Sequence, residues 1–478
     1  MRHVIVMAST ASIGLMAIFV VDFANLFYIS MLGQQELAAA IGYSGTLLFF
    51  LTSVAIGIMI GATAIVSRAL GAGDRERARL LAGSSAIFML VAMSAIAAMF
   101  FPFIPKAAAM IGAEGRTLEI TIEFLRIVVP SVPLLGLGLA FSGILRATGD
   151  AKRAMYATLC TGVMTAVLDP LLIFGLDLGV MGAAYSTAVS RVATIGLALY
   201  SIIKIHDMIA LPPVSMILKD VRPLLVIAVP AVLANVATPV ANAYVTSSVA
   251  MLGDQAVAGW AFIGRLIPLA FGLIFALSGA IGPIIGQNYG AGLYDRVRQA
   301  VIDSLTVTIV YTLIVWLLLF IARDYITASF RLTGEAAALV DFFINIVIVT
   351  FLFNGALFVA NATFNNLGYA TYSTLLNWGK ATVGTIPFVA AGAMMGGAKG
   401  AVAGQGIGYI VFGVVGVFLC LRVINKIAAM KKSDLPVAEP AVTMNAMPDF
   451  ASAKCAGMCM HQEKGEMEIR PTPVVKVA

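Results

Sequence analysis

The stretch VIVMASTASIGLMAIFVVDFANLFYISMLG at residues 4–33 returns without a gap at residues 224–253 as LLVIAVPAVLANVATPVANAYVTSSVAMLG, and both copies end in Met-Leu-Gly. Four shorter pairs follow in the same order, offset by 218 or 219 residues: GAGDRERAR (71–79) with GAGLYDRVR (290–298), EFLRIV (123–128) with DFFINIV (341–347), LRATGD (145–150) with FNNLGY (364–369), and GVMGAA (179–184) with GAKGAV (397–402). A general likeness among apolar helices would let these offsets drift. The nearly constant offset therefore indicates a duplicated unit of about 220 residues.

The composition excludes a soluble protein. Hydrophobic residues make up 60% of the chain, the mean hydropathy is +0.98 and charged residues make up 11%, against roughly 25% in soluble domains. Apolar stretches long enough to cross a hydrocarbon core of roughly 30 Å recur along the chain. The first of them runs too long for a cleavable signal peptide. We place twelve spans, centred near residues 17, 54, 90, 130, 164, 192, 236, 272, 310, 351, 382 and 411.

The duplication fixes the predicted architecture. Six spans per copy is an even number, so both copies have the same orientation and should be related by a pseudo-twofold axis along the membrane normal. We therefore predict an all-α integral membrane fold of twelve transmembrane helices in two six-helix bundles, an N-terminal lobe at 1–210 and a C-terminal lobe at 211–426. Residues 427–478 lack amphipathic periodicity and are predicted to be a disordered cytoplasmic tail.

Lysine and arginine are divided unequally between the two sides of the membrane. With the N-terminus inside, the inner side carries Arg68, Arg75, Arg77, Arg79, Arg146, Lys152, Arg153, Lys204, Lys219, Arg222, Arg296, Arg298, Arg422, Lys426, Lys431 and Lys432. The outer loops hold Lys106, Arg116, Arg323, Arg331 and Lys399. This bias predicts that both termini are cytoplasmic, in a plasma membrane that we expect to be a bacterial inner membrane. It also accounts for the net charge of +6 through anionic lipid headgroups, without a nucleic-acid partner.

The repeated Gly-Ala-Gly loops have an architectural interpretation. Glycine tolerates the positive φ that ends a helix, and the aspartate at position 74 favours the start of the next one. The arginines that follow would anchor the turn at the headgroups. We therefore assign the segment 71–79 to the architecture rather than to a substrate site.

An ordered set of segments resembles the multidrug and toxic compound extrusion (MATE) transporters. The segments are LGQQELAAA near the end of the first span, VSRALGAGDRERAR after the second, ILRATGDAKRAM between the fourth and fifth, LDPLLIFGLDLGVMGAAYST from the fifth into the sixth, and PIIGQNYGAGLYDRVR after the eighth. The resemblance covers about residues 4–425. It implies two six-helix lobes, V-shaped toward the outside, and an antiporter that exports amphipathic, usually cationic organic compounds or drugs by alternating access, driven by inward Na⁺ or H⁺.

Other classes of membrane protein fit the sequence less well. The major facilitator superfamily needs the loop Gly-x-x-x-Asp-Arg-x-Gly-Arg-Arg after its second span, and residues 71–79 lack both that spacing and its second glycine. A flippase for lipid-linked saccharides stays as an alternative, and it would need a cavity rich in arginine and open sideways to lipid. The chain has no Walker loop, His-Glu-x-x-His or Gly-x-Ser-x-Gly, so we expect neither ATP drive nor an enzyme.

Asp22 in the first span and Asp169 in the fifth are the clearest ionisable residues inside the spans. An acid in hydrocarbon is costly and usually faces a cavity or a partner. Both lie past the midpoint of spans that run outward, so they could meet in the outer half of the N-terminal lobe. There they would carry protons, or supply oxygen ligands to a small cation with help from the hydroxyls of Thr165, Thr187 and Ser142. Alternatively, Asp169 caps or bends its helix at the proline that follows it.

The resemblance implies a cation site in the N-terminal lobe, and Asp169 and Thr187 match its residues in the fifth and sixth spans. The family acid of the first span, in Asp-Thr-x-x-Val-Gly-x-Leu-Gly, falls on Asn25 when counted back from the Leu-Gly at 32–33. Asp22 lies almost one helical turn earlier, on roughly the same face, and would approach the site from one turn further in.

Three more positions depart from the family pattern. Thr165 and Ser142 stand where the family has asparagine. Thr10 stands where the first span of the family has proline, opposite Pro230 in the second copy, so a coupling mechanism that needs a proline-kinked first helix does not transfer to this chain.

The C-terminal lobe lacks an equivalent pair of acids. Asp22 aligns with Asn242 in the repeat, and Asp169 aligns with about Pro387. Asn354 and Asn361 belong to an uncharged polar stripe in the tenth span. We therefore expect the N-terminal lobe to bind the coupling ion, H⁺ or Na⁺, and expect no other cofactor.

Arginines inside the spans bear on the substrate. Arg191 falls near the middle of the sixth span and Arg265 in the outer part of the eighth. Arg191 would either neutralise an aspartate as a structural ion pair or face the cavity, where it would disfavour simple cations and permit anionic or zwitterionic compounds. With Asn242, Asn354 and Asn361, these two arginines are our candidates for residues that line the substrate cavity.

The tail contains a weak metal pattern. Cys455, Cys459 and His461 could bind a soft ion such as Cu(I) or Zn²⁺, but scattered ligands in a flexible tail are usually incidental, so we expect no metal site. Cys160 and Cys420 lie in spans and indicate no disulfide framework. We expect a monomer whose partners are a small-molecule substrate and the lipid bilayer.

Overall fold

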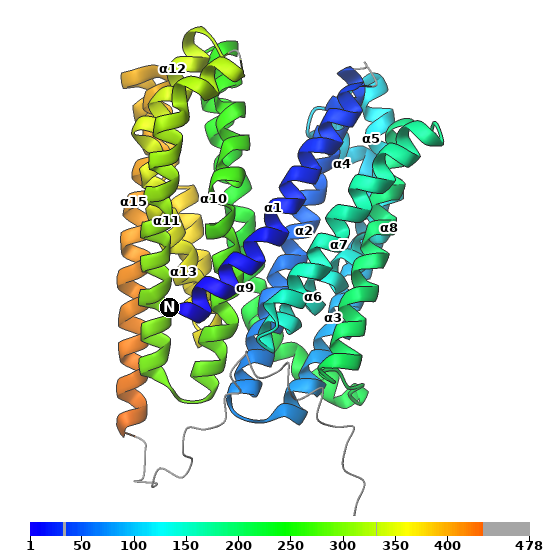
Figure 1. The fold of residues 1–478 in the computed structure, drawn as a ribbon, viewed down its shortest axis with the longest axis vertical. Helices are drawn as coiled ribbons and strands as arrows, with labels where there is room; N and C mark the ends of the chain where they lie inside the picture. The colour runs from blue at the N-terminus through cyan, green and yellow to red at the C-terminus, as the bar shows by residue number, and fades with distance from the viewer. Residues whose placement is uncertain (32–34, 331, 434–478) are drawn as a thin grey trace, which may run out of the picture. The chain divides into compact units, whose positions relative to one another are not determined.

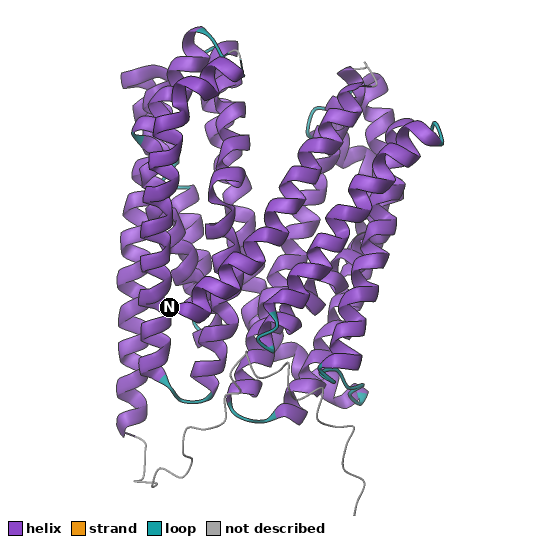
Figure 2. Ribbon diagram, in the orientation of Figure 1, coloured by secondary structure: helices purple, strands orange, loops and turns teal. Residues whose placement is uncertain are grey.

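The computed structural model describes residues 1–31, 35–330 and 332–433, and all regular secondary structure in these residues is helical (Figure 2). By internal contacts the chain divides into Met1–Ala428 and Ala429–Ala478. The first of these units contains the apolar helices predicted from the sequence.

The first half of the chain makes six crossings, and several are built from more than one helical segment because proline interrupts them. The segments are α1 (Arg2–Met31), α2 (Gln35–Gly71), α3 (Arg75–Phe100), η1 (Phe101–Phe103), α4 (Ile104–Met110), α5 (Gly115–Val128), η2 (Val129–Ser131), α6 (Val132–Ala147), α7 (Ala151–Pro170), η3 (Leu171–Gly175), α8 (Gly179–Tyr200) and η4 (Ser201–Ile205). Figure 1 shows α7 and α8 in one group of helices and α10, α11 and α15 in the other, with α1 slanting from the lower part of the second group to the top of the first.

The second half repeats this order. Its segments are α9 (Val214–Ala250), α10 (Asp254–Gly290), α11 (Tyr294–Ser329), α12 (Gly334–Asn345), η5 (Val347–Thr350), α13 (Phe351–Leu367), α14 (Ala370–Ala381) and α15 (Ile386–Ser433). In the described residues, eleven segments are long and apolar enough to cross a membrane, and the last of them, Ala370–Ala429, is 60 residues long.

This last segment contains two crossings, because α15 folds back on itself at a pair of glycines. Gly397 has φ +59° and ψ −140°, a conformation that residues with a Cβ rarely adopt. The two arms of the helix then pack backbone against backbone, and a Cβ on Gly392 would lie 2.0 Å from the carbonyl oxygen of Gly400. The part of the chain that the structure describes therefore contains the twelve predicted transmembrane helices, and the predicted fold class is confirmed.

The loop after α2 ends and starts helices as the sequence predicts. Gly73 has φ +79°, and the Asp74 carboxylate accepts a hydrogen bond from the backbone N–H of Arg77 at 2.9 Å, which caps the N-terminus of α3. The second copy of the loop has Gly292 at φ +73° but no side-chain cap on α11. The two copies therefore share the turn and differ in the cap.

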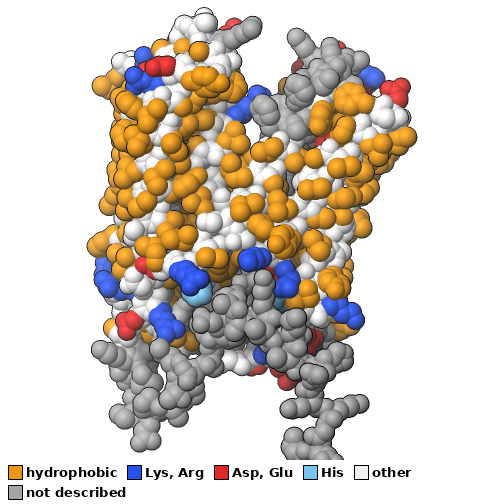
Figure 3. Space-filling model, viewed as in Figure 1, with side chains coloured by type: hydrophobic (Ala, Val, Ile, Leu, Met, Phe, Trp, Pro, Cys, Tyr) orange, Lys and Arg blue, Asp and Glu red, His pale blue; other side chains and the backbone are white. Residues whose placement is uncertain are grey.

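Apolar side chains cover the outside of the helices, as expected of a surface that faces lipid. Val163, Leu318 and Phe418 are 60%, 61% and 61% exposed. In the space-filling view, hydrophobic side chains cover the helices over most of their length, and most of the lysine and arginine side chains gather near the lower end (Figure 3). We call this the basic end, and it is the end predicted to be cytoplasmic.

The two halves of the chain touch each other mainly through α1 with α10 and α2 with α9. A Cβ on Gly57 of α2 would lie 2.3 Å from a methyl carbon of Val232 on α9, and one on Gly272 of α10 would lie 2.5 Å from the sulfur of Met16 on α1. Because lipid is as apolar as these helices, close approach through small residues is a main source of association in membranes.

Candidate functional site

Asp169 lies near the end of α7, eighteen residues after Ala151, where the helix begins (169 − 151), which is roughly 27 Å along the helix axis. Its side chain is 0% exposed. Pro170 follows and has no N–H for a regular helical hydrogen bond, and the chain continues as the π-helix η3. Wide turns of this kind are frequently found at functional sites. The structure thus places a buried carboxyl far from the basic end, beside a distorted turn.

A ladder of hydroxyl groups joins α7 to α8. Thr165 Oγ1 lies 2.9 Å from Ser190 Oγ, and Thr161 Oγ1 lies 2.5 Å from Thr194 Oγ1. Thr165 and Thr161 lie one and two helical turns before Asp169, so they share its face of α7. Only Thr165 was singled out from the sequence. The spacing of four residues on each helix is the signal that could have identified the other three residues.

The two other predicted hydroxyls lie on neighbouring helices. Thr187 on α8 is half-buried and donates a hydrogen bond to the carbonyl of Ala183, one turn earlier, at 2.9 Å. Ser142 is 5% exposed on α6. Both therefore belong to the interior of the N-terminal lobe, and their predicted part in ion binding stays a prediction.

Asp22 and Asn25 are part of helix α1, but their side chains lie outside what the structure describes. The backbone around them can still be placed. A Cβ on Gly14 would lie 3.2 Å from Thr158 of α7, and one on Gly162 would lie 3.5 Å from Val21 of α1. The two helices therefore run side by side in the same direction, and their register brings the last turns of α1 toward the end of α7.

Arg191 projects from the middle of α8 toward the junction of α5 and α6. Its Nη1 donates to Ser131 Oγ at 2.6 Å and to the backbone carbonyl of Val128 at 3.3 Å. These partners are neutral, and they lie at the start and the end of the short 3₁₀ turn η2, where proline interrupts the fourth crossing. Arg191 therefore stabilises a break in another helix. Its partners belong to the fourth crossing, so the sequence of its own span could not predict them.

Lys380 is the functional candidate that the sequence analysis missed. It lies in the last turn of α14, is 2% exposed, and donates from Nζ to Asn354 Oδ1 at 2.9 Å. Its ammonium nitrogen also lies 5.8 Å from the ring centroid of Phe358 and 5.6 Å from that of Tyr409, within the range of cation–π attraction. A lysine near the centre of a predicted span is the signal that could have identified it. Asn354, which was predicted to line the cavity, is its partner.

The remaining predicted residues do not lie together with Asp169 or Lys380 in a single site. Arg265 and Asn242 are exposed on α10 and α9, and Asn242 Oδ1 accepts a hydrogen bond from Gln405 at 3.4 Å. Asn361 is half-buried on α13, and its backbone carbonyl accepts from Ser373 Oγ at 3.2 Å. The tail residues of the weak metal pattern, Cys455, Cys459 and His461, lie outside the described residues.

At the basic end, Arg68 and Gln287 reach from the second helix of each half to the other half, in addition to the contacts of Asp220 on α9 with Arg77 and Ser84 on α3. Arg68 at the end of α2 donates from Nε to the carbonyl of Asn366 at 2.8 Å and from Nη2 to that of Asn365 at 3.0 Å. Gln287 at the end of α10 donates from Nε2 to the carbonyl of Ala147 at 2.7 Å. We call the three hydrogen bonds of Arg68 and Gln287 the bridging contacts.

The bridging contacts obey the repeat. Gln287 lies 219 residues after Arg68 (287 − 68), and Asn366 lies 219 residues after Ala147 (366 − 147). Each lobe thus extends a side chain from its second helix to the last carbonyls of the fourth crossing in the other lobe. These carbonyls have no partner within their own helices, so a side-chain donor from the opposite lobe stabilises both helix ends.

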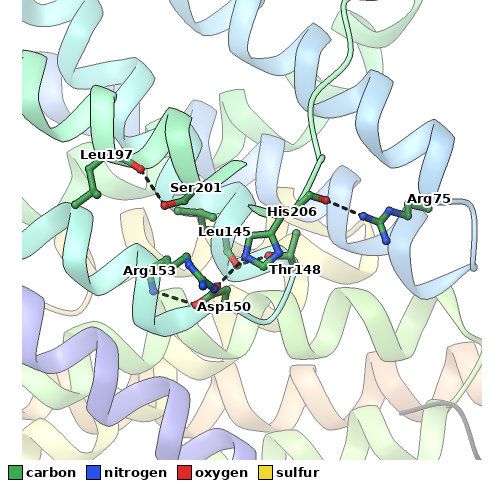
Figure 4. Close-up of polar contacts among 8 residues, drawn as sticks. All are labelled: Arg75, Leu145, Thr148, Asp150, Arg153, Leu197, Ser201 and His206. Carbon is green, nitrogen blue, oxygen red and sulfur yellow. Dashed lines mark hydrogen bonds and ion pairs between the residues drawn. The ribbon is translucent and has the colours of Figure 1, made fainter. Parts of the chain in front are cut away.

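A polar cluster next to the bridging contacts holds the segment that connects the two halves (Figure 4). Asp150 caps α7 by accepting from the backbone N–H of Arg153 at 3.0 Å, and it also contacts the Arg153 guanidinium and His206 Nε2, the latter at 2.7 Å. Arg75 donates to the carbonyl of His206 at 2.7 Å. Burial acts to raise the pKa of the Asp150 carboxyl, but the hydrogen bonds from His206 and Arg153 and the Arg153 charge hold it well below its usual range. The cluster borders a cavity of about 300 Å³ that Thr148 and Gln287 also line.

The sequence model of the MatE family matches the chain twice, over residues 11–171 and 230–391. The matches begin 219 residues apart (230 − 11), which is the offset of the internal repeat, and together they cover more than half of the chain.

Relatives and solved structures are similar over most of the chain. It is 26% identical to a FAD transporter of Shewanella oneidensis over 423 residues, 87% of this chain and 93% of that protein. It is 27% identical to the multidrug export protein MepA of Staphylococcus aureus over 376 residues, 76% of this chain and 81% of that protein. Its fold is that of the Vibrio cholerae MATE transporter VcmN, with a TM-score of 0.83 at 22% identity over 90% of this chain and 97% of that one. A MOP superfamily transporter from Pyrococcus furiosus matches with a TM-score of 0.82 at 24% identity, over 89% and 96%.

Proposed function

The chain belongs to the MatE family of membrane transporters, and on that premise we propose that it is an antiporter that exports amphipathic organic compounds in exchange for inward H⁺ or Na⁺. The relatives are a multidrug export protein and a FAD transporter, which supports a transporter of organic compounds. The coupling ion binds in the N-terminal lobe.

The observation that carries the coupling is the burial of Asp169. A carboxylate that is 0% exposed in a membrane helix is strongly destabilised unless a proton or a cation neutralises it. The hydroxyl ladder of Thr161, Thr165, Ser190 and Thr194 provides oxygen atoms along the same helices, which suits a relay or a cation path. Binding and release of the ion at Asp169 would change the charge of this lobe by one unit in each cycle.

In an alternating-access cycle, the bridging contacts would keep the basic end closed. They join the lobes at the basic end, which we propose to be cytoplasmic, and they must break when that end opens to admit substrate. Because the repeat relates the bridging contacts, each lobe loses a contact at the equivalent position when the basic end opens. The transporter would work as a monomer with both termini in the cytoplasm, in the inner membrane of a bacterium.

A flippase for lipid-linked saccharides is the less favoured alternative. That function needs arginines that are available to bind pyrophosphate in the cavity. Arg191, the arginine nearest the middle of a span, instead donates to Ser131 and Val128 of its own lobe. We therefore favour the exporter.

The experiment that tests the proposal is transport in everted membrane vesicles under separately imposed Na⁺ and pH gradients, with fluorescent organic cations and acids as substrates. Asp169→Asn should reduce gradient-driven export to the level of vesicles without the protein. The matched control is Asp177→Asn, because Asp177 is exposed in the loop after η3 and its φ of +54° is one that asparagine tolerates. Full export by Asp169→Asn would refute coupling in the N-terminal lobe.

A further inference from the structure

Lys380 is a buried ionisable group that the proposed ion coupling does not use. It lies ten residues after Ala370, where α14 begins (380 − 370), or roughly 15 Å along the axis, which is about half of a hydrocarbon core of roughly 30 Å. An ionisable residue at this depth is costly and commonly marks a pathway for a substrate or an ion. An ammonium group at this depth is therefore expected to have a partner of opposite charge.

The described surroundings of Lys380 contain no such partner. An ammonium has three N–H donors, and its one described acceptor is the neutral amide oxygen of Asn354 at 2.9 Å. None of the ion pairs in residues 1–31, 35–330 and 332–433 includes Lys380. The faces of Phe358 and Tyr409 stabilise a cation but do not neutralise it. A protonated Lys380 therefore has no described partner of opposite charge, and an anion would neutralise it.

The helix that carries Lys380 is interrupted directly after it, as helices at transport sites often are. Helix α14 ends at Ala381, the N–H of Gly384 turns back to the carbonyl of Gly379 at 2.8 Å, and Thr385 Oγ1 donates to the carbonyl of Lys380 at 2.8 Å. Discontinuous helices near the midplane form the binding sites of many transporters. The break is therefore a second observation that points to a ligand at this depth.

A buried amide lies on α15 one turn from the Tyr409 ring. Gln405 lies one turn before Tyr409 on α15, is 5% exposed, and donates to Asn242 Oδ1 at 3.4 Å. Asn242 is exposed on α9. A further aromatic ring packs on Tyr409, because Phe351 meets it edge to face at 6.3 Å between centroids. The site thus combines one cation, amide groups and flat apolar surfaces, a combination that fits an aromatic compound with an acidic group.

We propose that Lys380 binds the negatively charged group, a carboxylate or a phosphate, of the compound that the chain exports. This inference rests on the proposed export and names the class of substrate, which is organic compounds with a planar aromatic part and an acidic group. Lys380 is buried, so the anion binds when helices α14 and α15 move apart during the transport cycle. When the site is empty, the side chain of Asn354 holds the ammonium group of Lys380 in place. The role belongs to the C-terminal lobe alone, because the repeat places Thr161 opposite Lys380 (380 − 219).

Binding to the purified full-length protein tests the inference with two pairs of fluorescent probes. Rhodamine 110 and rhodamine 123 share a ring system and differ in one carboxyl group, which is an ester in the latter. Flavin mononucleotide and riboflavin share a ring system and differ in one phosphate. Wild-type protein should bind the acidic member of at least one pair more tightly, and Lys380→Met should lose that preference through a weakening of roughly tenfold or more for the acidic probe alone. The pair that responds distinguishes a carboxylate from a phosphate.

Two further variants separate recognition from folding. Lys380→Arg keeps the charge and should keep the preference for acidic probes, while Lys399→Met removes an exposed lysine of the same lobe and should behave as wild type. A preference that survives in Lys380→Met, or that is absent from the wild-type protein, overturns the inference. Acid-selective binding that depends on Lys380 without any gradient-driven export would refute the proposed antiport and leave the binding site standing.

Discussion

Removal of the Arg68 side chain should weaken the contact between the two lobes at the basic end. Its guanidinium makes two hydrogen bonds to carbonyls of the opposite lobe, at 2.8 and 3.0 Å. A hydrogen bond to a charged group contributes about 1.5–3 kcal/mol, and we take the lower limit because the side chain is half-buried. Arg68→Ala should therefore cost the joined state about 3 kcal/mol, which shifts the equilibrium roughly 100-fold toward separation. A separated state populated at about 1% would rise to about 50%.

Distances between spin labels measure this shift. Lys152→Cys and Thr371→Cys are suitable positions because both are exposed, follow the bridged helix ends and are related by the repeat (371 − 152 is 219). The native cysteines at 160, 420, 455 and 459 would be replaced first. Double electron–electron resonance should show a new, longer distance in Arg68→Ala, and a smaller shift of about fivefold in Gln287→Ala, whose single neutral bond is worth about 1 kcal/mol.

The control for this experiment is Arg116→Ala, which removes an exposed arginine paired with Glu119 within one helix and should leave the distances unchanged. Arg68→Lys keeps the charge but cannot bind two carbonyls with a planar fork, so it should give an intermediate result. An unaltered distance distribution in a well-folded Arg68→Ala protein would show that the bridging contacts do not hold the lobes together.

Two further predictions concern stability. Asp150→Asn keeps the helix cap but loses the charge, so at pH 7 it should lower the free energy of unfolding by roughly 1–3 kcal/mol. Because the folded pKa of Asp150 is depressed, its contribution is fully present above the unfolded pKa of about 4. The contribution falls progressively as the pH drops from there through the depressed folded pKa, so the melting temperatures of the two proteins should approach each other in acid. A constant difference would contradict this. In α15, a Cβ on Gly400 would lie 2.0 Å from the Gly392 carbonyl oxygen, whereas a Cβ on Gly396 would meet nothing within 4 Å. Gly400→Ala should therefore destabilise the protein by roughly 1–3 kcal/mol, and Gly396→Ala should not, as measured by thermal unfolding in detergent. Equal melting temperatures of the two variants would show that the arms of α15 can separate freely.

The twelve helices and the duplication could be predicted from the sequence because both depend on patterns that are local or periodic. Apolar length predicts a span, and a constant offset predicts a repeat. Apolar length predicted two spans near residues 382 and 411, although one helix, α15 (Ile386–Ser433), belongs to both of them. The backbone angles of Gly396 and Gly397 show where the chain turns between the two.

The candidate sites were predicted less completely because partners come from other helices. The sequence singled out Asn354 but not Lys380, which donates to it from another helix. Arg191 was expected to pair with an acid or to face the cavity, and its described partners are the neutral groups of Ser131 and Val128. The bridging contacts end on backbone carbonyls, and a carbonyl carries no signal in a sequence.

The repeat also shows how the two lobes came to differ. In each lobe the buried ionisable candidate lies on the fifth crossing, Asp169 on α7 and Lys380 on α14, so both lobes use the same element. The charges are opposite, and the position of Lys380 in the second copy corresponds to Thr161 of the hydroxyl ladder in the first. An acid surrounded by hydroxyls suits a small cation or a proton, whereas a lysine among aromatic rings suits an organic anion. On the proposed roles of Asp169 and Lys380, a duplicated frame supplies two different binding chemistries, and the bridging contacts, which retain the symmetry, would let an event in one lobe change the position of the other.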